Sequence, residues 1–257
     1  MRVALLAALL LGAAAPTFAQ DGPAPSPAPT AAGGLSLEQL AMMERVSDPR
    51  LSPDGRRVLY HVRTTDWDGN RGVGELWMID GDSAPRRLTV SDGGAGNGRW
   101  SADGRAVYFL SGRGGSSQVW RTDADGQAAT QVTTSPVDVA GFRVSPSGDA
   151  LVLVLPVFID CAELACTRDR LRARATRTAT VQAYDRLPLR PWDSWNDGRR
   201  NHLFVQALNG SGLADGAPRP LTPGLDADVP SRPLGGEGEY VISPDGRHVV
   251  FSTQTQG

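Results

Sequence analysis

A short turn motif recurs along the chain and constrains its fold more than any other feature. Its copies are Ser52-Pro53-Asp54-Gly55, Ser101-Ala102-Asp103-Gly104, Ser145-Pro146-Ser147-Gly148 and Ser243-Pro244-Asp245-Gly246. Ser and Pro open a tight turn after an apolar residue, and Gly supplies the positive φ that closes it. The motif serines are separated by 49, 44 and 98 residues. Periods of this length indicate a propeller or a solenoid.

Strand-like segments recur around each turn in the same order. β-branched and aromatic runs follow the turns at 57–62, 106–110, 150–155 and 248–251. A further set lies at 76–79, 119–121 and 203–205, and another at 87–89, 131–133 and 220–222. With the strand that ends at the turn, each unit has four strands, the size of a propeller blade. We expect an all-β fold, a β-propeller of four-stranded blades with about three and a half blades present; an ordinary β-sandwich is the alternative.

These landmarks also predict where the blades lie and where one is enlarged. Blade one should run from about 51 to 91, blade two from 99 to 135 and blade three from 142 to 224, and blade four should open near Tyr240. Blade three contains an insertion at about 160–200, in which Thr167 is expected to cap a helix running to about Ala183. The arginines of this helix are Arg168, Arg170, Arg172, Arg174 and Arg177. They indicate a solvated polar helix or, as the alternative, a surface for acidic partners.

The first residues predict export. Arg2, an apolar run from Val3 to Ala15, and small residues before a cleavage point near Ala19 form a signal peptide over residues 1–19. Residues 20–34 are rich in Pro, Ala and Gly and read as a flexible tether. The folded part, 35–257, should open with a short helix over 35–46, capped by Ser36 and ended by Pro49. We expect a periplasmic or secreted protein without a membrane anchor.

Few residues suggest a binding site. Cys161 and Cys166 are expected to form a disulfide, because the chain is exported. No His or second Cys pair lies beside them, so we expect no metal and no cofactor. Trp192 and Trp195 are candidates for substrate binding, although packing between the insertion and its blade is the favoured interpretation. The net charge of −2 favours no polyanion, and we expect no nucleic-acid partner.

The sequence contains no complete catalytic set. A nucleophile elbow of the G-x-S-x-G kind, which exposes a catalytic serine on a strained turn, does not occur in it. The three histidines, His61, His202 and His248, fall in or beside predicted strands, where a structural role is expected. We therefore assign no catalytic residue to this chain.

Two stretches resemble a known family. Leu35–Gly55 resembles the opening of the prolyl oligopeptidase family of serine peptidases, especially bacterial periplasmic dipeptidyl aminopeptidases and acylaminoacyl-peptidase-like enzymes. Asp160–Thr167, with Tyr184–Leu187 and Trp192–Trp195, resembles an insertion in that subgroup. The resemblance covers the chain after the tether. It implies a roughly seven-bladed propeller followed by a C-terminal α/β-hydrolase domain with a Ser-Asp-His triad, in which the propeller limits substrates to short peptides.

On this basis the chain is expected to be the N-terminal, substrate-gating propeller of an exported serine peptidase of the dipeptidyl or acylaminoacyl type. The hydrolase domain that would complete it is missing from this sequence, which stops inside a blade, so we expect a fragment or truncated product that is inactive alone. Short peptides would be the partners of the complete enzyme. The alternative is a non-enzymatic TolB-like periplasmic propeller that binds a partner protein.

Overall fold

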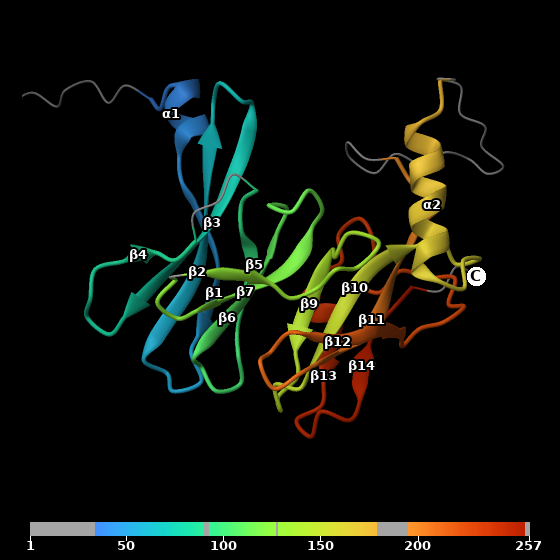
Figure 1. Ribbon diagram of the computed structural model, residues 1–257. Coiled ribbons are helices and arrows are strands. Elements are labelled where there is room, and N and C mark those ends of the chain that lie inside the picture. Colours follow the sequence, from blue (N-terminus) through green and yellow to red (C-terminus); the bar gives the residue numbers. More distant parts are fainter. Residues whose placement is uncertain (1–33, 90–92, 127, 179–194, 255–257) are drawn as a thin grey trace, which may run out of the picture. The chain divides into compact units, whose positions relative to one another are not determined.

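The computed structural model describes residues 34–89, 93–126, 128–178 and 195–254, and Figure 1 shows their elements. The predicted signal peptide and all of the tether except Gly34 lie outside these ranges. The chain divides into two compact units, Met1–Leu40 and Ala41–Gly257.

Helix α1 spans Leu37–Met42. As predicted, Ser36 caps it: its Oγ accepts the Gln39 N–H at 3.1 Å, and its own N–H donates to Gln39 Oε1 at 3.0 Å, a capping box.

The helix is shorter than the predicted segment 35–46. Strand β1, Arg45–Leu51, takes its last residues, and Val46 pairs with Val62 of the next strand. Pairing in the sheet overrides the local helical spacing on which the prediction was based. Pro49, predicted to end the helix, instead lies in an irregularity of β1 between Ser47 and Arg50. Blade one therefore begins earlier than the predicted boundary at residue 51.

Three four-stranded antiparallel sheets follow one another along the chain, each with its strands in sequential order. Blade one consists of β1, β2 (Arg57–Asp66), β3 (Arg71–Asp80) and β4 (Arg86–Arg87). Blade two consists of β5 (Gly96–Trp100), β6 (Ala106–Ser111), β7 (Gln118–Asp123) and β8 (Ala129–Gln131). Blade three consists of β9 (Gly141–Val144), β10 (Ala150–Val157), β11 (Arg200–Leu208) and β12 (Ala214–Pro220). After the 3₁₀ turn Glu237–Glu239, β13 (Tyr240–Ile242) and β14 (Val249–Phe251) form the described part of blade four. The predicted all-β architecture of four-stranded blades is confirmed.

In all four motif turns the Ser Oγ accepts the backbone N–H five residues further on; in blade three it donates to Asp149, the residue after the motif. In blade two, Ser101 Oγ donates to Asp103 Oδ1 at 2.6 Å and accepts the Ala106 N–H at 3.0 Å. The same two bonds recur in blades one and four. Gly104 has a φ of +69°, and the motif glycines of the other blades have φ values of +70° to +75°, the left-handed conformation that glycine adopts without strain. The turn predicted from Ser and Gly is thus present in all four copies.

A threonine ties the fourth strand of each complete blade to the third. These residues are Thr89, Thr133 and Thr222, all buried. Their hydroxyl oxygens accept the backbone N–H of Leu76, Val119 and Leu203 at 2.9, 2.9 and 3.2 Å. The regular ladders end two residues earlier, at Arg87, Gln131 and Pro220. The predicted fourth strands, 87–89, 131–133 and 220–222, therefore start and end too late. At these ends the third-strand N–H is bonded by the threonine side chain, while the third-strand carbonyl still accepts a backbone N–H.

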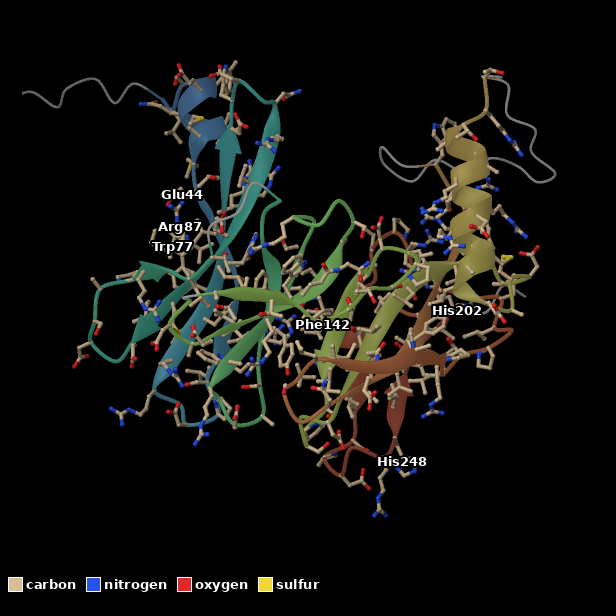
Figure 2. The ribbon with its side chains drawn as sticks, in the orientation of Figure 1. Glu44, Trp77, Arg87, Phe142, His202 and His248 are labelled. Carbon is tan, nitrogen blue, oxygen red and sulfur yellow. A yellow bond between two sulfur atoms is a disulfide. The ribbon has the colours of Figure 1, made fainter. Side chains whose placement is uncertain are left out.

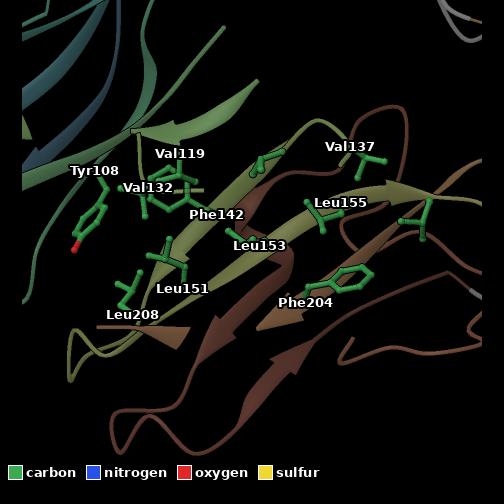
Figure 3. Packing of buried hydrophobic residues seen from close by; sticks show 12 residues of the cluster. Tyr108, Val119, Val132, Val137, Phe142, Leu151, Leu153, Leu155, Phe204 and Leu208 are labelled. Carbon is green, nitrogen blue, oxygen red and sulfur yellow. The ribbon is translucent and has the colours of Figure 1, made fainter. Parts of the chain in front are cut away.

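Apolar clusters lie between consecutive blades. One joins Tyr108, Val119 and Val132 of blade two to Phe142 and Leu153 of blade three, as Figure 3 shows. Strand β10 is buried on both faces because successive side chains point to opposite sides of a sheet. Its leucines belong to the cluster shared with blade two, whereas its central valines pack with Tyr240 of blade four. This explains why its sequence is a continuous apolar run.

The insertion lies between β10 and β11, within residues 158–199. Helix α2 spans Leu164–Ala175, so it begins before Thr167 and ends short of the predicted Ala183. Thr167 is not its cap: the residue is fully buried, and its hydroxyl oxygen accepts the Phe158 N–H at 3.2 Å. That bond fixes the helix to the end of the strand. The structure also contains a disulfide between Cys161 and Cys166, the pairing favoured by the sequence.

Candidate functional site

Residues of the first strands of all four blades line one hollow with a volume of about 250 Å³. Its charged lining consists of Arg50, Arg99 and Arg143. The remaining lining residues are Leu51, Trp100, Val144, Pro146, Val241 and Ile242. No acidic side chain is among the described residues of this lining. The hollow is therefore lined by basic and apolar residues.

The blade repeat itself gathers the three arginines. Each lies two residues before a motif serine, and they pair across to Leu59, Tyr108 and Val152 at the same place in their blades. In blades one and two an irregularity precedes the arginine, with Asp48 at φ +51° and Asn97 at φ +52°. Asp and Asn tolerate this left-handed conformation better than most residues. Blade four has Val241 at the equivalent position.

Two acidic residues hold the arginines in place: their carboxylates pair with Arg50 and Arg99, and a backbone carbonyl accepts from Arg143. Asp48 accepts from Arg50 at 2.6 Å and from Arg99 at 2.7 Å. Glu237 pairs with Arg99 and lies 3.7 Å from Arg50, while its backbone carbonyl accepts a hydrogen bond from Arg143. Burial disfavours the charged form of Arg99, but its hydrogen bonds to Asp48 and Glu237 outweigh this effect and raise its pKa. The guanidinium group therefore stays charged.

The cluster retains unused capacity for an anion. Three guanidinium groups face two carboxylates, so it carries one excess positive charge. Among the described residues, the Nε atoms of Arg50, Arg99 and Arg143 are buried and have no hydrogen-bond partner. Because these atoms have almost no exposed surface, the attraction of the cluster for an anion rests on its excess charge. The arrangement can bind an anionic group such as a carboxylate.

A second hollow, with a volume of about 120 Å³, lies beside the insertion. Its lining includes Phe158, Cys161, Glu163, His202 and Phe204. His202 is buried, and its Nε2 lies 2.8 Å from the backbone oxygen of Leu225. Burial lowers the pKa of His202, which keeps the ring neutral near pH 7. This histidine is therefore occupied by a structural bond, as expected from its place in a strand.

The other histidines are also accounted for by the strands. His61 lies opposite Ser47 in the β1–β2 ladder, and the Ser47 hydroxyl is 3.1 Å from His61 Nδ1. The cross-strand register alone brings these two residues together. His248 precedes β14 and is exposed; Figure 2 marks it and His202, which belong to different blades. Across the described ranges, no three His, Cys, Asp or Glu side chains form a group that could hold a metal ion.

The tryptophans predicted as substrate-binding candidates are not brought together by described structure. Trp192 lies outside the described residues. Trp195 is the first residue of the last described range, 195–254, and is 53% exposed. Their role in substrate binding stays a prediction.

In the same insertion, Arg170 forms a bidentate ion pair with Asp160 at 2.8 Å. Arg170 and Arg174 both stack on the Phe158 ring, at 4.5 and 4.6 Å from its centroid.

The arginine cluster was missed by the sequence analysis, although a signal was available. Arg occupies the position two before the motif serine in three of the four repeats. In a propeller, equivalent positions of the first strands converge, so a repeated charged residue there indicates a shared site. The partner Glu237 could not be found in this way, because it lies in the connection before β13, outside the repeat.

Comparison with known proteins agrees with this architecture. The sequence profile described as the TolB beta propeller domain matches residues 38–180, more than half of the chain. The chain belongs to the TolB β-propeller domain family. Within the ranges that the structure describes, no helix of this TolB β-propeller chain is long and apolar enough to cross a bilayer.

The TolB β-propeller chain is also similar to curated peptidases. It is 26% identical to dipeptidyl-peptidase 5 of Porphyromonas endodontalis, over 86% of this chain and 31% of that protein. It is 26% identical to dipeptidyl-peptidase 5 of Porphyromonas gingivalis, over 97% of this chain and 34% of that protein. The chain thus spans about a third of the length of these relatives. The predicted resemblance to the propeller part of such peptidases is confirmed.

A search of solved structures finds the acylaminoacyl peptidase of Pyrococcus horikoshii. The two chains are 15% identical, and the TM-score is 0.49 over 71% of this chain and 26% of that one.

Proposed function

We propose that this chain is the substrate-gating propeller of an exported serine peptidase that acts on short peptides. The observation that carries the proposal is the similarity to dipeptidyl-peptidases over 86% to 97% of the chain. The chemistry would come from an α/β-hydrolase domain of the complete enzyme, and the propeller would select peptides by size and charge. The arginine hollow supports this role, since it offers a basic surface where the first strands of the blades converge.

The proposed location is the periplasm or the extracellular space. The disulfide between Cys161 and Cys166 supports an oxidising compartment. The apolar N-terminal run with small residues before Ala19 supports export through a cleaved signal peptide. N-terminal sequencing of the protein recovered from the periplasm tests this location. A mature chain beginning near Gln20 is expected, and a chain that retains Met1 in the cytoplasm would contradict it.

Hydrolysis and active-site labelling test the peptidase proposal. The 257-residue chain and the product of the gene read beyond Gly257 are each assayed with dipeptide p-nitroanilides and with a fluorophosphonate that labels active serines. The extended product should hydrolyse the substrates and be labelled, whereas the 257-residue chain should do neither. Turnover by the 257-residue chain would show that its own residues are catalytic and would overturn the proposed division of labour.

A partner-binding propeller without enzymatic activity is the second candidate. The match to the TolB beta propeller domain favours it as much as it favours a peptidase propeller. The two candidates differ in the coding sequence downstream of the blades. A G-x-S-x-G segment after further Ser-Pro-Asp-Gly repeats selects the peptidase. A stop codon directly after the last blade, with no fluorophosphonate labelling, selects the binding protein.

A further inference from the structure

We infer that the arginine hollow binds the carboxylate of a short peptide and places the neighbouring side chain against its apolar wall. The inference rests on the proposed function in taking a peptide as the source of the carboxylate. The site itself is defined by Arg50, Arg99 and Arg143, by the two acidic residues that hold them, and by the lining around them.

Charge favours an anion over a cation or a neutral group. The residues lining the hollow are three arginines and six residues without charge. Asp48 and Glu237 pair with the arginines and are not among the described residues that line the hollow, so the charged residues of the described lining are all basic. The one excess positive charge would be neutralised by a single carboxylate.

Geometry favours a planar anion. Arg presents its donors in a flat fork that matches the two oxygens of a carboxylate. Ion pairs hold the forks of Arg50 and Arg99, and Arg143 lies over the Tyr240 ring at 5.2 Å. Binding therefore orders few side chains that were not ordered already, which lowers its entropic cost.

The wall beside the arginines is equally fixed. Trp100 is only 8% exposed. Its indole N–H donates to the backbone oxygen of Arg50 at 3.1 Å, and Arg57 stacks on its ring at 4.8 Å. Leu51, Val144 and Ile242 complete an apolar surface around it. A peptide side chain next to the bound carboxylate would contact this surface, which predicts a preference for an apolar residue there.

Direct binding to the 257-residue chain tests the inference. Isothermal titration compares acetyl-Ala-Leu with a free carboxylate, its C-terminal amide, and acetyl-Ala-Glu-amide, whose carboxylate is on the side chain. The free acid should bind at least about tenfold more tightly than the C-terminal amide. Tight binding of the Glu amide as well would assign the site to carboxylates in general, and its failure would assign the site to peptide C-termini. Equal binding of free acid and amide would overturn the inference, as would tighter binding of inorganic phosphate.

Variants separate a ligand site from a structural cluster. Arg143→Gln should weaken binding of the free acid at least about tenfold, and Arg170→Gln, on helix α2, should leave it unchanged. Glu237→Gln should strengthen binding several-fold, because it removes the carboxylate that competes for Arg50 and Arg99. A purely structural cluster predicts the opposite for Glu237→Gln: lower stability and no gain in affinity.

Circular dichroism establishes that each variant is folded. If Glu237→Gln does not fold, Asp48→Asn tests the same competition, since Asp48 also pairs with Arg50 and Arg99. A folded charge-neutralising variant without a gain in affinity would overturn the inference. The titrations measure binding and need no cleavage of the peptides, so failure of the peptidase assay leaves these results intact. Conversely, failure to bind would leave the peptidase assay decisive for the proposed function.

Discussion

The motif serine stabilises the turn between the first and second strands of each blade. In blade two, the Ser101 hydroxyl accepts one backbone N–H and donates to Asp103, so it closes the turn from both sides. We expect Ser101→Ala to lower the free energy of unfolding by about 1 to 2 kcal/mol, because both bonds are lost. Urea unfolding followed by circular dichroism measures this change. Ser211→Ala, at an exposed loop position, serves as control and should change stability by less than about 0.5 kcal/mol.

The aspartates of these turns make stability depend on acid pH. Hydrogen bonds, first of all from Ser52, Ser101, Ser147 and Ser243, lower the pKa values of Asp54, Asp103, Asp149 and Asp245. A lowered pKa in the folded state stabilises the fold above the ordinary value of 3.8 and stops doing so as the pH falls through the lowered value. The melting temperature should therefore drop steeply below about pH 4.

Substitution of a turn aspartate should reduce this acid sensitivity. In Asp103→Asn one of the four contributions is absent, so the melting temperature should fall less between about pH 5 and pH 3 than in the unsubstituted chain. Melting curves across this range measure the slope. Asp68→Asn removes an exposed carboxylate outside the motif turns and is the matched control. Equal slopes for the two variants would contradict the assignment to the turns.

At the scale of single residues, the sequence predicted what depends on local chemistry. The turn glycines, the Ser36 cap and the motif serines follow from backbone preference and could be read directly. Thr167 could not, because its hydroxyl is used by Phe158 and not by the helix. The arginine site depends on three strands meeting, which a single segment does not reveal.

A buried threonine hydrogen-bonds the end of the fourth strand to the third strand in each complete blade. Thr133 Oγ1 accepts the Val119 N–H at 2.9 Å and donates to Gln118 Oε1 at 2.8 Å. Thr133→Val keeps the shape but leaves the N–H without its partner, so we expect a loss of about 1 to 3 kcal/mol in unfolding free energy. Thr133→Ser retains the hydroxyl and should lose less. Thr130→Val, exposed on β8, should stay within about 0.5 kcal/mol in the same urea titration.

The disulfide at the start of the insertion should act locally. Intact-mass measurement of the exported protein should show a loss of two hydrogens relative to the reduced chain, about 2 mass units, and no thiol that alkylates before reduction. The bridge closes a loop with a sequence separation of 5, so its entropic contribution is at the small end, about 2 kcal/mol.

Replacing the bridge should separate local from global effects. In Cys161→Ser/Cys166→Ser, amide hydrogen exchange should speed up in helix α2 and remain unchanged in β6 and β7, since a short bridge orders only its own surroundings. Faster exchange throughout blade two would show that the bridge supports the whole domain and would contradict this expectation.

At the scale of elements, the sequence predicted whether a segment is a helix or a strand better than it predicted where that helix or strand begins and ends. Helix α1 is shorter at both ends than the predicted segment 35–46. Val46 shows why: its helical spacing is outweighed by pairing with Val62, a contact that depends on the neighbouring strand. The fourth strands were predicted in the right order, but each predicted segment starts one to six residues too late and ends two residues too late. At the end of the fourth strands, a Thr hydroxyl accepts the third-strand N–H in place of a backbone oxygen.

The whole domain depends on packing between blades. Phe142 is fully buried in the cluster that joins blade two to blade three, as Figure 3 shows. Phe142→Ala should cost about 3 to 5 kcal/mol, because the cavity would lie in the seam between two sheets. Urea unfolding measures the loss. Leu234→Ala, at a residue that is 91% exposed, is the control. A loss below about 1 kcal/mol for Phe142→Ala would mean that the blades are stable separately.

At this largest scale the repeat was sufficient to predict the architecture, because each complete blade repeats the same turn and strand order. It could not predict how sheets face one another. Strand β10 reads as a uniform apolar run, and only the positions of blades two and four show that its leucines and valines serve different interfaces.

The insertion point between β10 and β11 has a consequence for engineering. These strands pair without interruption from Ala150–Ala207 to Val157–Arg200, so the ladder is already complete where the chain leaves it. Lengthening the loop at such a place costs little additional closure entropy. The junction is therefore a natural grafting position, where a short hairpin or a foreign peptide epitope could replace the native excursion while the surrounding sheet keeps its alignment.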